Sequence, residues 1–262
     1  MRVVLSGKTD IGRQRDLNED ALLLLPEFSL MAVADGLGGH RSGRVASQLA
    51  VSTLHDFFVV TVRPDATWPF PYDERLSDEE NYLYTGIRLA NRRIFDRALK
   101  TLVDFGMGTT CVAGMFSPDL KHFAVAHVGD SRGSLLRDGV LTTLTRDHSL
   151  VSDAIHAAPW MTQEEIAQLP QNVITRALGI REEVQIDLHR QATKAGDVIL
   201  LCTDGLTGQV SDREVVELIA QAGLDGSQER LDACAEALIS RANAAGGRDN
   251  VTVTLAQLVE DS

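Results

Sequence analysis

Strand-like segments fall into two separate blocks along this chain of 262 residues, and the helical segments lie between and after those blocks. The first block covers residues 21–25 and 29–34, on either side of a Pro-Glu turn. Helical spacing of apolar residues follows over 42–58 and 78–102, separated by a proline-rich loop over 63–77. A parallel sheet would require strict alternation of strand and helix, so this order favours an α+β fold with antiparallel sheets.

The second block of strands begins at residues 110–116 and 122–128 and continues at 133–137 and 140–143, around a tight Arg137-Asp138-Gly139 corner that is typical of a hairpin. Later strands are predicted at 184–188, 198–202 and 251–259, and later helices at 213–222 and 229–244. Residues 147–175 are predicted to be irregular, with one helical patch at 163–168. No linker rich in Pro, Gly or Ser divides the chain, and we expect one domain over residues 1–262.

The composition disfavours several classes of protein. Asp and Glu number 37 against 25 Lys and Arg, and a net charge of −12 repels the phosphate backbone of nucleic acids. The three cysteines are odd in number and lack metal-ligand spacing, which favours a reducing, cytoplasmic compartment. Residues 1–10 carry no signal-peptide core, and no apolar run reaches the roughly 20 residues of a spanning helix. We therefore expect neither nucleic acid nor a membrane as a partner.

Acidic residues stand at the ends of several apolar strands, often beside glycine. Those residues are Asp35, Asp130 and Asp204, which follow strands, and Glu19, Asp20 and Asp249, which precede them. One Asp-Gly pair after a strand is usually only a turn, but that explanation is poor for the whole set. Carboxylates that converge on one site repel one another unless a cation lies among them, and oxygen ligands suit Mg²⁺ or Mn²⁺. Zinc is disfavoured because the chain has no Cys/His quartet.

A cationic partner for a phosphate lies near the first acidic pair. Arg15 stands four residues before Glu19, and a guanidinium offers two parallel hydrogen bonds to phosphate oxygens. Arg13 has the same chemistry and lies two residues earlier, so the residue types alone do not separate the two. Cys111 and Cys202 lie in predicted strands without cationic neighbours, which disfavours a cysteine nucleophile.

Seven short segments occur in the order found in one enzyme family. They are residues 15–20, 34–40, 108–110, 127–132, 144–149, 202–206 and 247–250. On these segments the chain resembles the bacterial metal-dependent protein phosphatases of type 2C over residues 9–258. The resemblance implies a four-layer sandwich, in which two antiparallel β-sheets are flanked by helices and a binuclear metal centre lies between the sheets.

The resemblance also implies a role for each acidic residue. Asp35 would bridge two Mg²⁺ or Mn²⁺ ions, and the Gly36 carbonyl would complete the shell of one ion. The remaining assignments are Asp204 and Asp249 on the other ion, Asp130 on a third and weaker site, Glu19 and Asp20 on metal-bound waters, and Arg15, rather than Arg13, on the phosphate. Two cations lower the pKa of a water between them and neutralise phosphate oxygens, so that water can hydrolyse the ester directly.

The predicted function is the hydrolysis of phosphoserine and phosphothreonine on proteins in the cytoplasm, opposite a cognate Ser/Thr kinase. Two alternatives stay open: a pseudophosphatase that only binds a partner, and a hydrolase of small phosphate esters. His40 is a candidate general acid, although eukaryotic relatives place a His directly after the Asp-Gly pair, where this chain has Leu37. Residues 147–175 correspond to the family's flap, in which Trp160 and Met161 would contact substrate or pack onto the domain.

Overall fold

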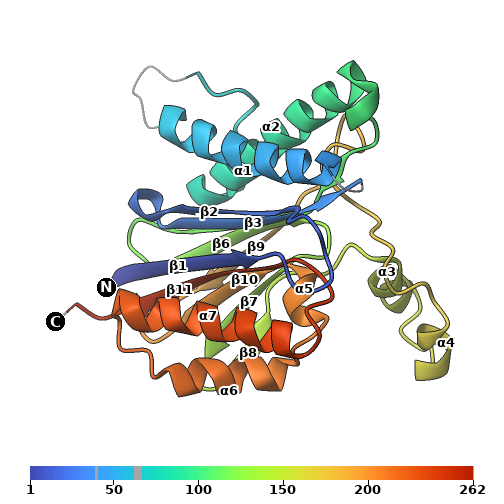
Figure 1. Ribbon diagram of the computed structural model, residues 1–262. Helices are drawn as coiled ribbons and strands as arrows, with labels where there is room; N and C mark the ends of the chain where they lie inside the picture. The colour runs from blue at the N-terminus through green and yellow to red at the C-terminus, as the bar shows by residue number, and fades with distance from the viewer. Residues whose placement is uncertain (39–40, 62–66, 262) are drawn as a thin grey trace.

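The computed structural model describes residues 1–38, 41–61 and 67–261. Two antiparallel β-sheets pack face to face between two layers of helices (Figure 1), which confirms the predicted α+β sandwich. One sheet has the order β2-β3-β5-β6-β9, with β4 paired to β3, and the other has the order β1-β11-β10-β7-β8. The strands of the first sheet are β2 (Asp20–Leu25), β3 (Leu30–Leu37), β4 (Gly108–Thr109), β5 (Cys111–Phe116), β6 (His122–Val128) and β9 (Asp187–Ala192). The strands of the second are β1 (Arg2–Asp10), β7 (Arg132–Arg137), β8 (Val140–Thr143), β10 (Val198–Cys202) and β11 (Val251–Val259).

Two pairs of helices cover the outer faces of the sheets. The helices α1 (Arg41–Thr61) and α2 (Asp78–Lys100) cover the first sheet, and α6 (Asp212–Ala222) and α7 (Gln228–Ala244) cover the second (Figure 1). The shorter helices are η1 (Pro26–Phe28), η2 (Leu102–Asp104), α3 (Leu150–Ala157), α4 (Gln163–Ala167) and α5 (Asp204–Thr207). Among the described residues, no helix combines the length and the apolar character needed to cross a bilayer.

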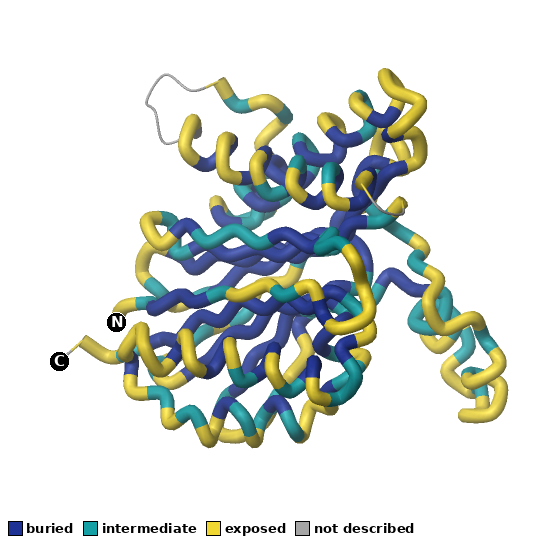
Figure 2. The backbone as a smooth tube through the Cα atoms, in the orientation of Figure 1, coloured by how far each residue is buried: buried dark blue, intermediate teal, exposed yellow. Residues whose placement is uncertain are grey.

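Apolar side chains from both sheets meet in the middle of the sandwich. Met31 and Val33 of β3 and Val125 of β6 pack in one cluster with Ile199 and Leu201 of β10, and all five are buried. Alternate residues of these strands face this cluster, and the others face the helices. Figure 2 shows the buried strands as two stacked layers beneath exposed helix surfaces. The core therefore holds the ends of the strands of both sheets in fixed relative positions.

Several boundaries differ from the prediction. β1 was not predicted, because its solvent-facing polar residues dilute the apolar signal, but it pairs along its whole length with β11. The segment predicted to be irregular at 147–175 contains α3 as well as α4, and Ser149 caps α3 by accepting from Ser152 N–H. β9 begins at Asp187 rather than at 184. The helix predicted over 78–102 ends at Lys100, so Leu102 is 95% exposed instead of lying on the apolar face.

Candidate metal centre

The strand ends that carry the acids meet at one edge of the sandwich. Asp20 at the start of β2 lies directly opposite Asp35 near the end of β3, since these strands are antiparallel. The end of β10 likewise lies beside the start of β11, where Cys202 pairs with Val253. A cleft of about 620 Å³ opens at this edge. Its lining includes Arg15, Glu19, Asp35, Gly36, Asp130, Asp204 and Asp249.

The backbone at Asp35 and Gly36 is fixed from two sides. Asp35 N–H donates to Thr110 Oγ1 at 2.9 Å, and the Asp35 carbonyl accepts from Thr109 Oγ1 and from Thr110 N–H, both at 2.8 Å. A Cβ at position 36 would lie 2.2 Å from the carbonyl oxygen of Gly43, so this close approach of β3 to α1 requires glycine. The Asp-Gly pair is therefore held rigidly where it faces the cleft.

Asp20 joins the two sheets by side-chain hydrogen bonds. Its Oδ2 accepts from Thr203 Oγ1 at 2.9 Å and from Thr252 Oγ1 at 2.6 Å, and both threonines belong to the second sheet's edge. Sequence reasoning did not identify these two threonines: Thr203 directly precedes Asp204, and Thr252 lies three residues after Asp249, and neither has a signal of its own. Oδ2 of Asp20 is thus satisfied by hydrogen bonds within the protein, whereas Oδ1 has no hydrogen-bond partner among the described residues.

Burial and mutual repulsion raise the pKa of these carboxyl groups. Burial, with the charges of Asp204 and Asp249, raises the pKa of Asp20 to about 7. Burial and the charge of Asp204 raise the pKa of Asp130 to about 7 as well. The pKa of Asp35 stands well above its ordinary value because the side chain is buried among the other acids. Burial and Asp249 also raise the pKa of Asp204. The metal-free cluster therefore resists full ionisation.

The donor set fits hard divalent cations. Asp20 Oδ1, Asp130 Oδ1 and Asp204 Oδ1 are buried without a hydrogen-bond partner among the described residues. Leaving a buried acceptor unsatisfied costs free energy, and a cation among these oxygens would both satisfy them and remove their repulsion. The ligands are oxygens only, as Mg²⁺ and Mn²⁺ prefer. The arrangement is therefore that of a metal centre rather than of a set of turns.

The two candidate arginines are placed differently. Arg15 Nη2 donates to Asp249 Oδ2 at 2.6 Å, and Arg15 lines the cleft beside the acids. Arg13 donates its backbone N–H to the carbonyl of Gly247 at 2.7 Å; both arginines are exposed, but Arg13 does not line the cleft. The geometry favours Arg15 as the group that meets an anion in the cleft.

Further cleft residues were not assigned a role from the sequence. Arg132 donates through Nε and Nη2 to both oxygens of Asp147, at 2.9 and 2.7 Å, and this ion pair lines the cleft with Arg248. All three residues lie inside the quoted motif segments, which was the available signal. Their charges border the metal-centre acids on the side of the second sheet.

The flap contributes to the cleft through its return segment. Gln171, Asn172 and Ile174 line the cleft, whereas Trp160 and Met161 do not. The α3–α4 segment projects from the body of the molecule (Figures 1 and 2), and Trp160 is 80% exposed, which argues against packing of that side chain onto the domain. A substrate contact by Trp160 or Met161 stays a prediction. His40 lies outside the described residues.

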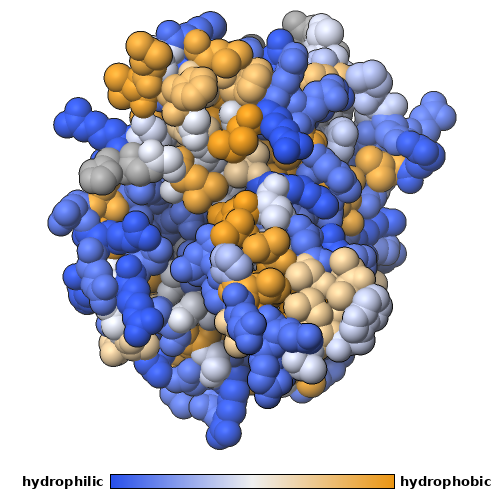
Figure 3. All heavy atoms as spheres, turned by 90° about the vertical axis from the view of Figure 1, so that its right-hand side faces the viewer, coloured by the Kyte–Doolittle hydropathy of each residue, from blue (hydrophilic) through white to orange (hydrophobic). Residues whose placement is uncertain are grey.

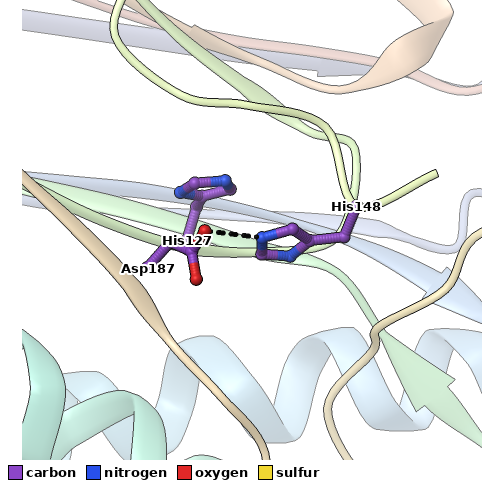
Figure 4. A group of neighbouring side chains, drawn as sticks. All are labelled: His127, His148 and Asp187. Carbon is purple, nitrogen blue, oxygen red and sulfur yellow. Dashed lines mark ion pairs between the residues drawn. The ribbon is translucent and has the colours of Figure 1, made fainter. Parts of the chain in front are cut away.

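A second cluster of metal-type residues lies behind the turn after β6 (Figure 4). The ligand atoms of His127, His148 and Asp187 lie within 4.8 Å of one another, and the two rings are stacked with centroids 4.6 Å apart. His148 Nδ1 accepts from Gly129 N–H at 3.0 Å, so Nε2 carries the proton and faces Asp187 Oδ2 at 3.2 Å. Arg176 Nη1 donates to Asp187 at 2.8 Å, so the positive charge beside this carboxylate comes from an arginine of the chain and a metal ion is not needed to balance it. This cluster is a hydrogen-bonded support for the turn that carries Asp130.

The three cysteines do not offer a nucleophile. Cys111, Cys202 and Cys234 are free and buried. Burial raises the pKa of the Cys111 and Cys202 thiols to about 12, and that of Cys234 to about 11. Because a reactive cysteine needs a lowered pKa and access to substrate, these side chains serve as packing residues.

The chain is similar to known proteins over most of its length. A family model described as protein phosphatase 2C matches residues 10–239. The chain is 38% identical over 256 residues to a putative protein phosphatase 2C-type of Streptococcus pyogenes, covering 96% of each chain. It is 35% identical over 254 residues to the serine/threonine phosphatase stp of Listeria monocytogenes, covering 95% of this chain and 94% of that one.

Solved structures agree over almost the whole chain. The serine/threonine phosphatase PstP/Ppp of Mycobacterium tuberculosis superposes with a TM-score of 0.81 at 34% identity, covering 99% of this chain and 100% of that chain. A structure of the PstP catalytic domain in complex with two manganese ions matches with a TM-score of 0.79 at 34% identity, covering 98% and 100% of the two chains.

Proposed function

The chain belongs to the protein phosphatase 2C family, and from this premise we propose that it hydrolyses phosphoserine and phosphothreonine on proteins with water and divalent metal ions. The observation that carries the proposal is that carboxylates from both sheets meet beside the Arg15 guanidinium. Three of their buried oxygens have no hydrogen-bond partner in the part of the chain that the structure describes. Relatives named as serine/threonine phosphatases and a relative solved with two manganese ions support it.

We assign two ions to the centre, either Mg²⁺ or Mn²⁺. In this assignment Asp35 would be a ligand of both ions, and the Gly36 carbonyl would complete the shell of one of them. Asp204 and Asp249 would hold the other ion. Asp130, on a turn of its own after β6, would contribute to a third and weaker site. Asp130 lines the same cleft, and its Oδ1 is buried without a hydrogen-bond partner among the described residues, which supports a place for it near the ions.

Side chains of the protein would bind the phosphate, hold water and protonate the leaving group. When bound, the ions would lower the pKa of a water molecule and neutralise phosphate oxygens. Arg15 binds the phosphoryl oxygens and orients the phosphorus toward the acids, since its guanidinium already reaches into the cleft. Asp20, held by Thr203 and Thr252, presents its free oxygen as a hydrogen-bond acceptor for water, and Glu19 lines the same wall. His40 is our candidate to protonate the leaving oxygen.

The biological setting follows from this chemistry. The substrates would be phosphoproteins made by a cognate Ser/Thr kinase. The three free, buried cysteines fit a reducing compartment, and we assign the protein to the cytoplasm. The complete acid set favours an active enzyme over a pseudophosphatase that only binds partners.

The proposal is tested by hydrolysis of one phosphoserine and one phosphothreonine peptide. We expect activity with Mn²⁺ or Mg²⁺, none with EDTA, and little with Ca²⁺, which prefers more ligands at longer distances and is a weaker Lewis acid. Asp35→Asn should abolish turnover while the protein stays folded by circular dichroism. Full activity without metal would contradict the mechanism. Hydrolysis of p-nitrophenyl phosphate alone would indicate a small-ester hydrolase, and phosphopeptide binding without any turnover a pseudophosphatase.

A further inference from the structure

Large apolar side chains are exposed in one short run beside the cleft. Leu99, Leu102, Val103 and Phe105 are 63%, 95%, 80% and 73% exposed. They are exposed because α2 ends at Lys100 and the chain turns away through η2. Figure 3 shows apolar side chains gathered in the upper half and centre of this face of the molecule. We call Leu99, Leu102, Val103, Phe105 and the nearby Ile180, which is 49% exposed, the apolar rim.

The backbone holds the apolar rim against the wall of the cleft. Ser42 Oγ donates to the Val103 carbonyl at 2.9 Å, which ties the run to the start of α1. Two residues beyond Phe105, Met107 is fully buried, and β4 then pairs with Gly36 and Leu37 at the end of β3. Leu37 and Gly36 line the cleft. The short strand β4 therefore connects the apolar rim to the end of β3, which carries the proposed ligand Gly36.

A hollow of about 320 Å³ continues the apolar rim on its other side. Its lining combines the apolar residues Ala177, Ile180 and Val184 with polar and charged ones, which are Asp153, Thr175, Arg176, Arg181, Glu183 and Gln185. Ile180 packs on β4, because its Cδ1 lies 2.9 Å from where a Cβ on Gly108 would be. The neighbour of Thr175, Ile174, lines the cleft itself. Cleft and hollow therefore share the segment 174–175 as a common wall.

Charges of both signs surround the apolar rim. Asp153 and Glu183 line its hollow together with Arg176 and Arg181, and Lys100 is exposed next to Leu99. The local charge therefore does not select an anionic partner. The whole chain carries a net charge of −12, so two copies of it repel each other, which disfavours a second copy as the occupant. Contiguous exposed apolar surface of this kind marks an interaction site.

We propose that the apolar rim and its hollow bind apolar side chains that flank the phosphorylated residue of a protein substrate. The inference rests on the proposed function, since it needs a phosphoprotein in the cleft. A substrate segment that places its phosphate among the acids passes over the shared wall at residues 174–175, so its neighbouring side chains reach the hollow and the rim. Apolar contacts there add affinity that small phosphate esters cannot use.

The experiment compares wild type with the triple variant Leu102→Ser, Val103→Ser, Phe105→Ser. These side chains are exposed, so the changes should leave folding intact. Substrates are a phosphothreonine peptide flanked by Leu and Ile, a matched peptide flanked by Ser and Asn, and p-nitrophenyl phosphate, all with Mn²⁺. Val140→Ser is the matched control, because Val140 is 63% exposed at the start of β8, in the β7–β8 hairpin, and does not line the cleft.

We expect wild type to favour the apolar-flanked peptide and the triple variant to lose about tenfold in kcat/KM on that peptide, mainly through KM. Activity on p-nitrophenyl phosphate should change less than twofold, and the control should match wild type. Equal hydrolysis of both peptides by wild type and variant would overturn the inference and leave the proposed function standing. No phosphopeptide hydrolysis by wild type would overturn the proposed function. A dimer by light scattering that the triple variant dissociates, with unchanged peptide kinetics, would make the apolar rim a self-association face and also overturn the inference.

Discussion

Arg15 is the residue to which we assign recognition of the phosphate. Its guanidinium reaches Asp249 in the cleft, and an incoming phosphate would compete for the same donors. Arg13 lies in the same loop with its residue exposed and serves as a matched control. Variants at the two positions therefore distinguish a direct contact with phosphate in the cleft from the effect of a positive charge nearby.

Arg15→Ala is expected to weaken binding of phosphopeptide and of inorganic phosphate by about 1.5–3 kcal/mol, the range for hydrogen bonds to charged groups. Arg15→Lys should restore only part of this, because an ammonium keeps the charge but loses the two parallel hydrogen bonds. Arg13→Ala should have a much smaller effect. The measurements are KM for a phosphopeptide and the inhibition constant of phosphate at fixed ionic strength. A large effect of Arg13→Ala with none from Arg15→Ala would move the phosphate site by two residues.

The turn between β6 and β7 is the element that connects the flap to the metal centre. His148 holds it at two points, since His148 N–H donates to the Gly129 carbonyl at 2.9 Å and Gly129 N–H donates to His148 Nδ1. The His148 carbonyl also accepts from Thr175 N–H at 2.8 Å, at the flap's return segment. Burial lowers the pKa of His148 and keeps the ring neutral, as this acceptor role requires. One side chain thus positions the turn that carries Asp130.

His148→Ala is expected to raise the Mn²⁺ concentration needed for half-maximal activity, in the same direction as Asp130→Ala, because the turn loses its side-chain support. It should also lower the free energy of unfolding by about 1–3 kcal/mol, since Gly129 N–H and Asp187 lose a partner. His148→Asn should recover part of the metal response, because its side-chain oxygen can accept from Gly129. His189→Ala, on an exposed β9 position, is the control. A loss of stability with an unchanged Mn²⁺ requirement would show that His148 serves folding alone.

At the scale of the whole molecule, the acids of the proposed metal centre lie where the two sheets are hydrogen-bonded to each other. Asp20 of the first sheet bonds Thr203 and Thr252 of the second, and both sheets contribute acids to the same cleft. The acids with raised pKa bind protons more tightly in the folded chain than in the unfolded one. Without metal, their contribution to stability is therefore present below about pH 4 and is lost as pH rises toward 7.

Asp20→Asn is expected to stabilise the metal-free protein near pH 8 by roughly 2–4 kcal/mol, and to have little effect near pH 4, because it removes a carboxyl whose pKa is raised to about 7. The measurement is the difference in unfolding free energy between variant and wild type across this range. The lowered pKa values of His127 and His148 change stability with pH in the opposite sense, but equally in both proteins, so the difference removes them. Saturating Mn²⁺ should raise the melting temperature of wild type at pH 8. A stability difference between variant and wild type that is no larger at pH 8 than at pH 4 would contradict this account.

The sequence determined the order and type of most elements. Strong periodicity in α2 and α7, and the Asp138-Gly139 corner between β7 and β8, needed no tertiary information, because local spacing and turn chemistry decide them. The sequence also indicated which acids belong together, since each stands at a strand end. It could not establish β1, whose partner strand β11 lies near the other end of the chain, with pairs from Arg2↔Val259 to Asp10↔Val251. It also could not establish the point at which α2 stops.

Only the tertiary structure decided what those residues face. It separated Arg15 from Arg13, brought Thr203 and Thr252 onto Asp20, and left Leu102 in solvent where helical spacing alone would have buried it. These are relations between segments far apart in the chain. Their free energy comes from packing and from hydrogen bonds across two sheets, and no local pattern of residues records it.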